Sequence, residues 1–264
     1  MLANNSIGNL GRLGNQMFQY ATLRGLASKH SYEYCLPPKD YVGTLDPNCK
    51  NTDTSIFDCF KIPEVPRLLL DVPVIQESCF ELDEELWNNC SDNISLYGYF
   101  QTEKYFKHID STIREDFTFV DKIFHSCYYF LENTFGYSNC ISLHIRRGDY
   151  LKYTHHPEQP MSYYETALTQ FPELPVLVFS DDIEWCRQQE LFKRERFYLS
   201  EGNGTAYDLC LQSLCQYHII ANSSFSWWGA WLADSQNVIA PRNWFGPPLS
   251  YNTKDLYLNH WTII

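Results

Sequence analysis

Short apolar runs alternate with stretches of helical spacing between residues 136 and 240, and this alternation most constrains the fold. Strands are expected at residues 140–145, 176–179, 217–221 and 237–240. Helices are expected at residues 161–170, from 183 onward, and at 205–216 and 227–234. Strands that alternate with helices are typical of a parallel sheet. The sequence therefore predicts an α/β protein with a parallel sheet in its second half.

The N-terminal region begins with a glycine loop, residues 8–14, followed by a helix expected at residues 15–30. Asn15 is the expected N-cap of this helix. The loop is not a phosphate-binding loop, because no Lys-Ser/Thr pair follows it, and it lacks the Gly-x-Gly-x-x-Gly fingerprint of dinucleotide sites. Residues 31–95 are rich in proline and suggest loops with short elements. A strand is expected at 94–101, a helix from 102 and another at 121–133.

The length of 264 residues allows two lobes of ordinary size, with a cleft between them. We place the boundary near residue 136, which gives lobes of residues 1–135 and 136–264. No apolar run is long enough to span a membrane, and the first residues lack the basic region and apolar core of a signal peptide. We therefore expect a cytoplasmic protein without a transmembrane segment. The formal net charge of −12 disfavours nucleic-acid binding.

The ten cysteines show neither a Cys-x-x-Cys pair nor the Cys/His spacing of a zinc site. Several lie in apolar segments, where a reduced cysteine acts as a small apolar residue. An even cysteine count and five Asn-x-Ser/Thr triplets would also fit a lumenal protein with disulfides. We favour reduced thiols in a cytosolic enzyme.

The run from His144 to Asp149, His-Ile-Arg-Arg-Gly-Asp, directly follows the expected strand at 140–145. Side chains alternate along a strand, so His144 and Arg146 share one face, opposite Ile145. Arg147 falls on the other face or in the turn. A guanidinium is a good bidentate partner for phosphate, so this strand end predicts an anionic ligand. The alternative is a surface ion pair between Arg146 and Asp149.

Two more polar clusters follow expected strands, Ser180-Asp181-Asp182 and Asn222-Ser223-Ser224. Open parallel sheets bind ligands at the carboxyl ends of their strands. Each cluster also has a plainer interpretation, because Asp181 resembles the first residue of a helix capping box, and Ser224 or Ser226 could cap the next helix. The tryptophans at 227, 228 and 231 are interpreted as core residues rather than as a platform for a sugar.

Five segments together resemble the α1,2-fucosyltransferase family, glycosyltransferase family 11. They are GRLGNQMFQYA (11–21), LYGYFQTEKYF (96–106), HIRRGDY (144–150), FSDDIEWC (179–186) and NSSFSWWGAWLA (222–233). The resemblance implies the GT-B architecture, with two Rossmann-like lobes that face a cleft. It also implies a metal-independent, inverting enzyme without a cofactor, which moves L-fucose from GDP-β-L-fucose to the 2-hydroxyl of a terminal β-galactose. Residues 1–135 would form the acceptor side, and residues 136–264 would bind GDP-fucose.

The resemblance also implies roles for single residues. Arg146 would contact the β-phosphate, His144 would lie beside the guanine, and Asp208 would accept hydrogen bonds from the guanine edge. Ser223 and Ser224 would hold the pyrophosphate, and Gly14 and Asn15 would face the fucose and the acceptor. Further candidates for the site are Arg147, Asn222, Asp181, Asp182, Arg12 and His155.

The chemistry of fucose transfer agrees with these residues. Negative charge develops on GDP as the bond to fucose breaks, and a fixed guanidinium such as that of Arg146 stabilises it. The sequence has no Asp-x-Asp motif, which a metal-using transferase would be expected to carry. The acceptor hydroxyl needs only a weak base, for which Asp149 is the first candidate and His155 the second.

Two other functions fit parts of the sequence. A non-catalytic glycan-binding module would keep the aromatic residues without turnover. A metal-dependent phosphohydrolase could be built from His144, Asp149, Asp181 and Asp182, but the sequence lacks a dense His/Asp cluster.

Overall fold

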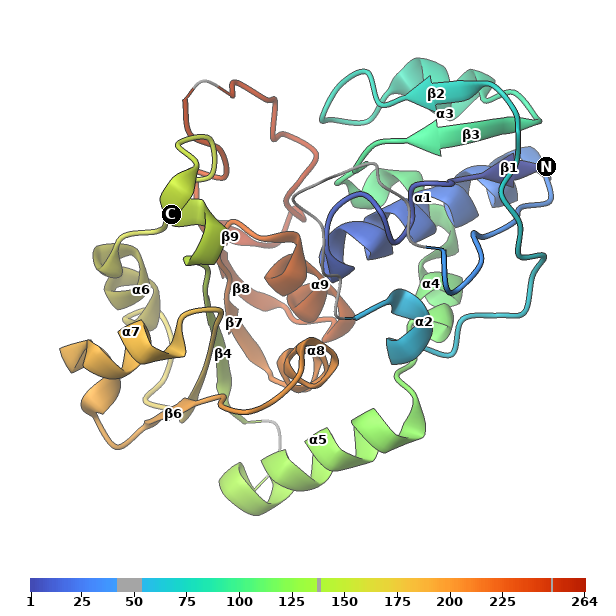
Figure 1. Cartoon of the computed structure of the whole chain (residues 1–264). Helices are drawn as coiled ribbons and strands as arrows, with labels where there is room; N and C mark the ends of the chain where they lie inside the picture. The colour runs from blue at the N-terminus through green and yellow to red at the C-terminus, as the bar shows by residue number, and fades with distance from the viewer. Residues whose placement is uncertain (42–53, 137–138, 248) are drawn as a thin grey trace. The chain divides into compact units, whose positions relative to one another are not determined.

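Two parallel sheets organise the chain, one in each of two compact units (Figure 1). The computed structural model describes residues 1–41, 54–136, 139–247 and 249–264. The first unit comprises Met1–Val120 and Tyr251–Leu258, and the second comprises Asp121–Ser250 and Asn259–Ile264.

The second unit carries a six-stranded parallel sheet in the order β6-β5-β4-β7-β8-β9. Its elements are α5 (Asp121–Phe135), β4 (Ile141–Ile145), η3 (Gly148–Lys152), α6 (Met161–Leu168), β5 (Val176–Ser180), α7 (Ile183–Gln188), η4 (Glu190–Lys193), β6 (Phe197–Leu199), α8 (Thr205–Ser213), β7 (Tyr217–Ile219), α9 (Ser224–Leu232), β8 (Asn237–Ala240) and β9 (Thr262–Ile263). The chain adds β5 and β6 on one side of β4, and then returns to add β7 on the other side. This order creates a topological switch point between β4 and β7.

The two faces of β4 pack against different helices, as its alternating sequence predicts. Ile141, Leu143 and Ile145 belong to a buried apolar core that also includes residues of α6 and α7. His144 points to the opposite face, where its ring meets Ser226 of α9. Figure 1 shows α6 and α7 on one side of the sheet and α8 and α9 on the other. The predicted facing of β4 is confirmed.

The tryptophans of α9 lie in the core of the second unit. Trp227 and Trp228 are fully buried, and their ring centroids are 5.0 Å apart. Trp231 lies 5.1 Å from Trp228, and Trp261 lies 5.6 Å from Trp227. The prediction of core packing is confirmed. This apolar anchor fixes α9, and with it the start of α9 at the carboxyl edge of the sheet.

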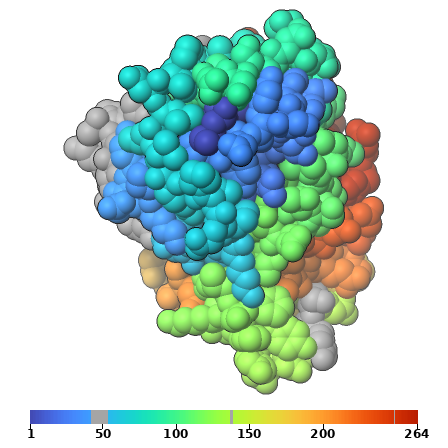
Figure 2. Space-filling view, turned by 90° about the vertical axis from the view of Figure 1, so that its right-hand side faces the viewer, coloured from blue at the N-terminus to red at the C-terminus, as the bar shows by residue number. Residues whose placement is uncertain are grey.

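The first unit has a three-stranded parallel sheet in the order β1-β3-β2. Its elements are β1 (Leu2–Ala3), α1 (Leu13–His30), α2 (Ile56–Cys59), β2 (Val74–Gln76), α3 (Glu84–Asn89), β3 (Ile94–Tyr97), η1 (Glu103–Tyr105), η2 (Lys107–Ile109) and α4 (Asp110–Asp116). Both residues of β1 are buried. Figure 2 accordingly shows only a small dark blue area at the start of the chain, surrounded by later segments of this unit.

The division of the chain differs from the expected boundary between residues 135 and 136. The helix α5 groups with the second unit, because its apolar face is buried and the Cys127 thiol donates to the Tyr207 carbonyl of α8 (3.5 Å). The segment Tyr251–Leu258 groups with the first unit. There Asp255 accepts hydrogen bonds from Lys104 Nζ (2.6 Å) and from the Leu82 amide (3.1 Å).

Three expected helix caps are wrong. Arg12, not Asn15, occupies the N-cap position of α1, which begins two residues earlier than expected. Asp182, not Asp181, caps α7 by accepting from the Trp185 amide, and Ser223 caps α9. Each cap was placed from residue type alone, whereas the turn that leads into a helix decides which side chain reaches the free amides.

The strands expected at 94–101 and 217–221 are shorter in the structure, and three short strands were not expected. The strand expected at 94–101 ends at Tyr97, and the left-handed conformation of Phe100 (φ 53°) is incompatible with a strand that continues to residue 101. β1, β6 and β9 contain only two or three residues each, too few to show a period. The expectation of loops with short elements for residues 31–95 is confirmed where the structure describes them.

Nine cysteines among the described residues are not joined in disulfides, and Cys49 lies outside the described residues. No helix in the described part of the chain has both the length and the apolar character needed to cross a bilayer.

Gly25 allows α1 to contact η1. A Cβ atom added at Gly25 would lie 1.9 Å from the main-chain oxygen of Tyr105. We expect Gly25→Ala to lower the free energy of unfolding by about 1–3 kcal/mol, because this overlap outweighs the gain of about 1 kcal/mol in helix propensity. Urea denaturation followed by circular dichroism measures the change. Ser28→Ala, on the exposed part of the same helix, is the matched control and should be neutral. A Gly25→Ala protein as stable as the wild type would contradict the packing.

Candidate nucleotide-sugar site

The candidate site lies in the second unit, at the carboxyl ends of β4 and β7. These two strands are neighbours on either side of the switch point. Helices leave the two strands toward opposite faces at a switch point, and open α/β sheets bind ligands beyond the carboxyl ends of the strands there. The run after β4 and the serine loop after β7 are therefore brought to one edge, as the sequence predicts.

His144 is a buried, neutral residue. Only 5% of it is exposed, and its Nδ1 atom lies 2.9 Å from Ser226 Oγ. Burial, together with the nearby charge of Arg146, lowers the pKa of His144 to about 3. The ring also packs against Phe225, with centroids 5.6 Å apart. His144 therefore ties β4 to the first turn of α9.

Arg146 lies between two carboxylates. Its Nη2 atom donates to Asp149, and its Nη1 atom lies 2.8 Å from Asp181 Oδ2. Its side chain is only 14% exposed, and its guanidinium carbon is 5.2 Å from the ring centroid of Tyr150. The ion pair of Arg146 with Asp149, the alternative considered from the sequence, is thus present. The second carboxylate comes from the end of β5 and holds the guanidinium from another direction.

Asp181 also fixes the backbone of this turn. Its Oδ1 atom accepts from the Arg147 amide at 2.8 Å. A Cβ atom at Gly148 would lie 2.3 Å from Asp181 Oδ2, so glycine is needed for this close approach. Asp181 therefore orients both the Arg146 side chain and the main chain that follows it.

Arg147 makes a separate set of contacts. It pairs with Glu158, and its Nε atom lies 3.2 Å from Asp182 Oδ2. Its guanidinium carbon lies 3.8 Å from the ring centroid of Trp185. The two arginines therefore have different partners, in line with the predicted split of their side chains.

The serine loop after β7 leads directly into α9. Ser223 Oγ accepts from the Phe225 amide (3.4 Å), and Ser224 is the first residue of the helix. The start of a helix favours anions, because its amides and its dipole point toward them. Asn222 is buried, and its Nδ2 atom donates to the carbonyls of Pro157 (2.9 Å) and Trp244 (3.0 Å). Asn222 thereby holds the loops that border the serine loop.

Asp208 lies in the first turn of α8. Its Oδ1 atom accepts from Ser200 Oγ (2.7 Å), and this hydroxyl also accepts from Asn203 Nδ2 (3.0 Å). Burial raises the pKa of Asp208 to about 6, although the hydrogen bond from Ser200 opposes the shift. This carboxyl group is therefore set to change charge just below neutral pH.

Tyr150 of η3 and His156 of the loop after η3 lie near Arg146. The ring of His156 stacks on Tyr150, with centroids 5.0 Å apart, and the Tyr150 hydroxyl donates to the Asn222 carbonyl (2.9 Å). Burial, the neighbouring His155 and the charge of Arg146 lower the pKa of His156, against the opposing effect of Asp149. His155 is half-buried, with its ring 4.7 Å from that of His156. Tyr150 and Glu158 were not among the candidates expected from the sequence, although Tyr150 lies inside the segment 144–150. Ser226 was expected only as a possible helix cap.

The candidates of the glycine loop lie in the first unit. Gly14 is buried inside α1, and the Arg12 side chain is exposed at the start of this helix. Asn15 Oδ1 accepts from Gln101 Nε2 at 2.9 Å. Gly11 has a positive φ of 77°, and a Cβ atom there would lie 2.3 Å from Asn15 Nδ2. The loop therefore closes tightly around the Asn15 amide.

The model of the family described as Glycosyl transferase family 11 matches residues 2–264. The chain belongs to glycosyl transferase family 11. The resemblance drawn from the five segments is confirmed, and the protein is a glycosyltransferase.

Curated relatives include an alpha-1,2-colitosyltransferase of Escherichia coli, which is 33% identical over 89% of this chain and 90% of that protein. The O-antigen biosynthesis glycosyltransferase WbnK of Escherichia coli is 30% identical over 94% of this chain and 98% of that protein. The galactoside 2-alpha-L-fucosyltransferase SEC1 of Bos taurus is 27% identical over 88% of this chain and 65% of that protein.

Solved structures share the fold. A crystal structure of NodZ alpha-1,6-fucosyltransferase soaked with GDP-fucose matches with a TM-score of 0.57 and 13% identity, over 91% of this chain and 96% of that one. A crystal structure of POFUT1 in complex with GDP matches with a TM-score of 0.52 and 12% identity, over 90% of this chain and 97% of that one. The predicted α/β fold of GT-B type is confirmed for this family member.

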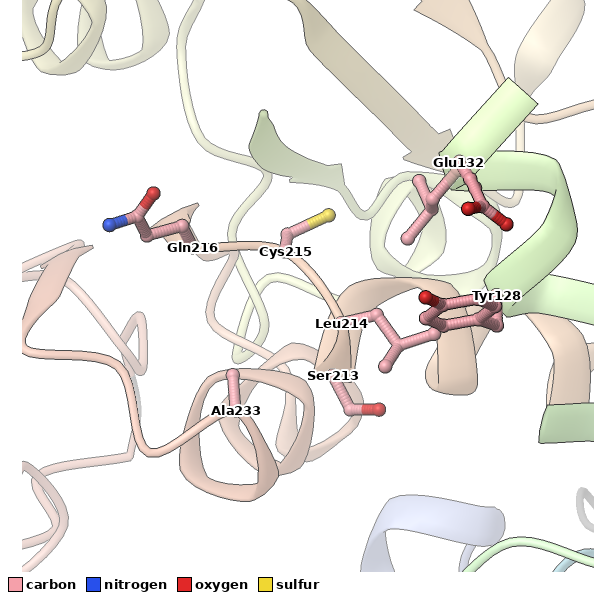
Figure 3. A pocket seen from close by; sticks show the side chains of 8 residues that line it. Tyr128, Glu132, Ser213, Leu214, Cys215, Gln216 and Ala233 are labelled. Carbon is pink, nitrogen blue, oxygen red and sulfur yellow. The ribbon is translucent and has the colours of Figure 1, made fainter. Parts of the chain in front are cut away.

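Among the described residues, no group of three or more His, Cys, Asp or Glu side chains is arranged to hold a metal ion. A cavity of about 470 Å³ is lined by α5 and by the segment from Ser213 to Gln216. Figure 3 shows Tyr128 and Glu132 on one side of it and Ser213 and Leu214 on the other. Cys215 and Gln216 precede β7, so this cavity lies at the amino ends of the strands, away from the candidate site.

Ser226 is expected to stabilise the site through His144. Ser226→Ala leaves a buried imidazole nitrogen without its partner, which should lower the free energy of unfolding by about 1–3 kcal/mol. Chemical denaturation of the second unit, followed by tryptophan fluorescence, measures the loss. Ser213→Ala, which removes only a local bond to the Cys210 carbonyl, serves as the control. Equal losses in the two variants would contradict the coupling of β4 to α9.

Proposed function

We propose that the protein transfers L-fucose from GDP-β-L-fucose to the 2-hydroxyl of a terminal β-galactose, with inversion at the anomeric carbon. Family membership and the galactoside fucosyltransferases among the relatives support this reaction. The observation that carries the proposal is the convergence of Arg146 and the start of α9 at one switch point. Both features suit the diphosphate of a nucleotide sugar.

Residues of the second unit would bind the donor. The pyrophosphate would lie against Ser223, Ser224 and the first amides of α9, with Arg146 on the β-phosphate. Arg146 would keep Asp181 as its orienting partner and exchange Asp149 for a phosphate oxygen. Asp149 is 38% exposed, so it can turn away at little cost.

Asp208 would accept hydrogen bonds from the guanine edge, and His144 would support the wall beside the base. Asn222 and Arg147 would act on the donor site through the loops that they hold. Asp182 caps α7 and pairs with Arg147, so we give it the same supporting role.

Acceptor recognition would belong to residues 1–135, where Asn15, Gly14 and Arg12 border the glycine loop. The α5 residues are the exception in this range, because they pack with the second unit.

The chemical step requires charge stabilisation on the leaving GDP and removal of a proton from the acceptor hydroxyl. Arg146 and the start of α9 stabilise the charge as the bond between fucose and phosphate breaks. Asp149, once released from Arg146, is the first candidate for the base, and His155 is the second. Neither the donor site nor this step calls for a metal ion.

The reaction is tested by incubating the protein with GDP-fucose and lactose in the presence of EDTA. We expect a fucosylated trisaccharide, detected by mass spectrometry, and an equal amount of free GDP. Absence of both products would overturn the proposal, and activity that disappears only with EDTA would overturn its metal-independent form. A parallel reaction with a colitose donor tests the donor sugar suggested by the most similar of the relatives named above. Faster transfer of colitose would change the assigned donor.

Arg146 and Arg147 should differ in their effect on turnover. Arg146→Lys should lower kcat by about 100-fold or more, because an ammonium group cannot replace the guanidinium that meets both Asp181 and the phosphate. Arg147→Lys should lower kcat by less than about tenfold, since the partners of Arg147 are protein carboxylates that also pair with an ammonium group. Steady-state kinetics with saturating lactose compares them. Similar losses in both variants would contradict the assignment of Arg146 to the leaving group.

GDP binding should depend on the ionisation of Asp208. Its raised pKa of about 6 means that the carboxyl group becomes protonated as the pH falls through this value, and it then accepts poorly from the guanine N–H groups. We expect the GDP affinity to fall by about tenfold from about pH 8 to about pH 5. Calorimetry measures this affinity, and Asp208→Asn should bind GDP weakly and independently of pH. A wild-type affinity that stays constant across this range would exclude Asp208 from guanine recognition.

A further inference from the structure

Glu77 is a buried carboxyl group that the proposed reaction does not use. It directly follows β2, and its amide donates to the Tyr97 carbonyl at the end of β3 (2.8 Å). Its side chain therefore lies at the carboxyl edge of the sheet of the first unit, the edge where open α/β sheets bind ligands. The glycine loop after β1 leaves the same edge.

The carboxylate of Glu77 holds the turn after β3. Its Oε2 atom accepts from the Tyr99 amide and its Oε1 atom from the Phe100 amide, both at 2.8 Å. A Cβ atom at Gly98 would lie 2.4 Å from Glu77 Cβ, so this glycine is needed for the close approach. Glu77 thus uses both oxygens to bind two successive main-chain amides.

The turn that Glu77 holds is strained. Phe100 has a φ of 53°, a left-handed conformation that an aromatic residue rarely adopts, and its side chain is fully buried. Tyr99, at the tip of the turn, keeps 36% of its surface exposed. Strain of this kind persists only where the surroundings enforce it, and it is concentrated at functional sites.

The turn leads directly to the Asn15 amide. Gln101, the next residue after the turn, donates from Nε2 to Asn15 Oδ1 (2.9 Å). Gln19 Nε2 links the same turn to the glycine loop, with bonds to the carbonyls of Gly98 (3.1 Å) and Leu10 (2.9 Å). The position of Asn15 therefore depends on the position of the turn.

We infer that Glu77 is a positioning residue of the acceptor site, which it serves by fixing the turn from Gly98 to Phe100. The inference rests on the proposed function, in which Asn15 faces the fucose and the acceptor. Glu77 would act through the turn and Gln101 and would not touch the sugar. The turn would present the Tyr99 ring and the Asn15 amide to a galactose-terminated glycan.

The ionisation of Glu77 supports this role. Burial raises its pKa to about 7, although the two amides favour the charged form. Burial of a carboxylate costs folding free energy, and buried carboxyl groups with shifted pKa values are typical of functional sites. The described titratable groups that interact with it are the Cys79 thiol and the Tyr105 phenol. Burial raises the pKa of both, so neither changes charge near neutral pH.

The first test measures the kinetics of Glu77→Gln with lactose and GDP-fucose. One of the two hydrogen bonds from the main-chain amides is lost, because the glutamine NH2 group cannot accept from a main-chain N–H. We expect the KM for lactose to rise by about tenfold, while the KM for GDP-fucose stays within about twofold. Glu85→Gln removes an exposed carboxylate from the same unit and is the control, with unchanged kinetics. A wild-type KM for lactose in Glu77→Gln, or an equal rise in both constants, would overturn the inference.

The second test asks whether Glu77 acts through Gln101. Gln101→Ala should raise the KM for lactose in the same way. The KM of the double variant should be no higher than that of the single variant with the higher KM. Additive effects would overturn the inference. If Glu77→Gln does not fold, Gln101→Ala decides alone, and an unchanged KM there would also overturn it.

The pH dependence gives a readout that a purely structural role would not produce. The charged carboxylate accepts from both amides, and the protonated form loses one of these bonds. The wild-type KM for lactose should therefore rise as the pH falls through about 7, and that of Glu77→Gln should not. The same pH dependence in both proteins would overturn the inference. A wild type that transfers no fucose at any pH would instead overturn the proposed function, and the inference with it.

Discussion

The parallel pairing of β4 with β5 on one side and β7 on the other is the constraint on which the second unit depends. It brings the ends of three strands to one edge, although they are separated by 35 to 74 residues in the sequence. Arg146, Asp181 and Ser223 lie at the same edge of the sheet for this reason. The buried tryptophans of α9 then fix the start of that helix at the same edge.

Charge compensation gives this edge its rigidity. Arg146 and Arg147 are largely buried, and each contacts two carboxylates. Removal of a guanidinium from water is unfavourable unless it is paired, so the acidic residues stabilise the unliganded site. They also orient the guanidinium before a ligand arrives, which favours catalysis because little reorganisation is needed. The first unit follows the same principle, with the Glu77 carboxylate holding two amides of a strained turn.

Patterns that depend on local periodicity were predictable from the sequence. The facing of Ile145 and His144 on β4 follows from the alternation of side chains along a strand. The burial of Trp227 and Trp228 follows from their large apolar surface. Helix caps were not predictable, since Ser223, Ser224 and Ser226 are chemically similar and only the path of the turn decides which hydroxyl reaches a free amide. The grouping of α5 with the second unit was not predictable either, because its apolar face does not show that it will pack on α8.

The sequence by itself determined the α/β class, the family and the strand end that carries Arg146, because these depend on local patterns and on segments that keep their order along the chain. Only the tertiary structure decided the partners of these residues. Three such contacts join residues that are 23 to 82 positions apart in the sequence. They are those of Asp181 with Arg146, of Ser226 with His144 and of Glu77 with the turn after β3. Such contacts follow from strand order and register, which no local pattern of residues specifies.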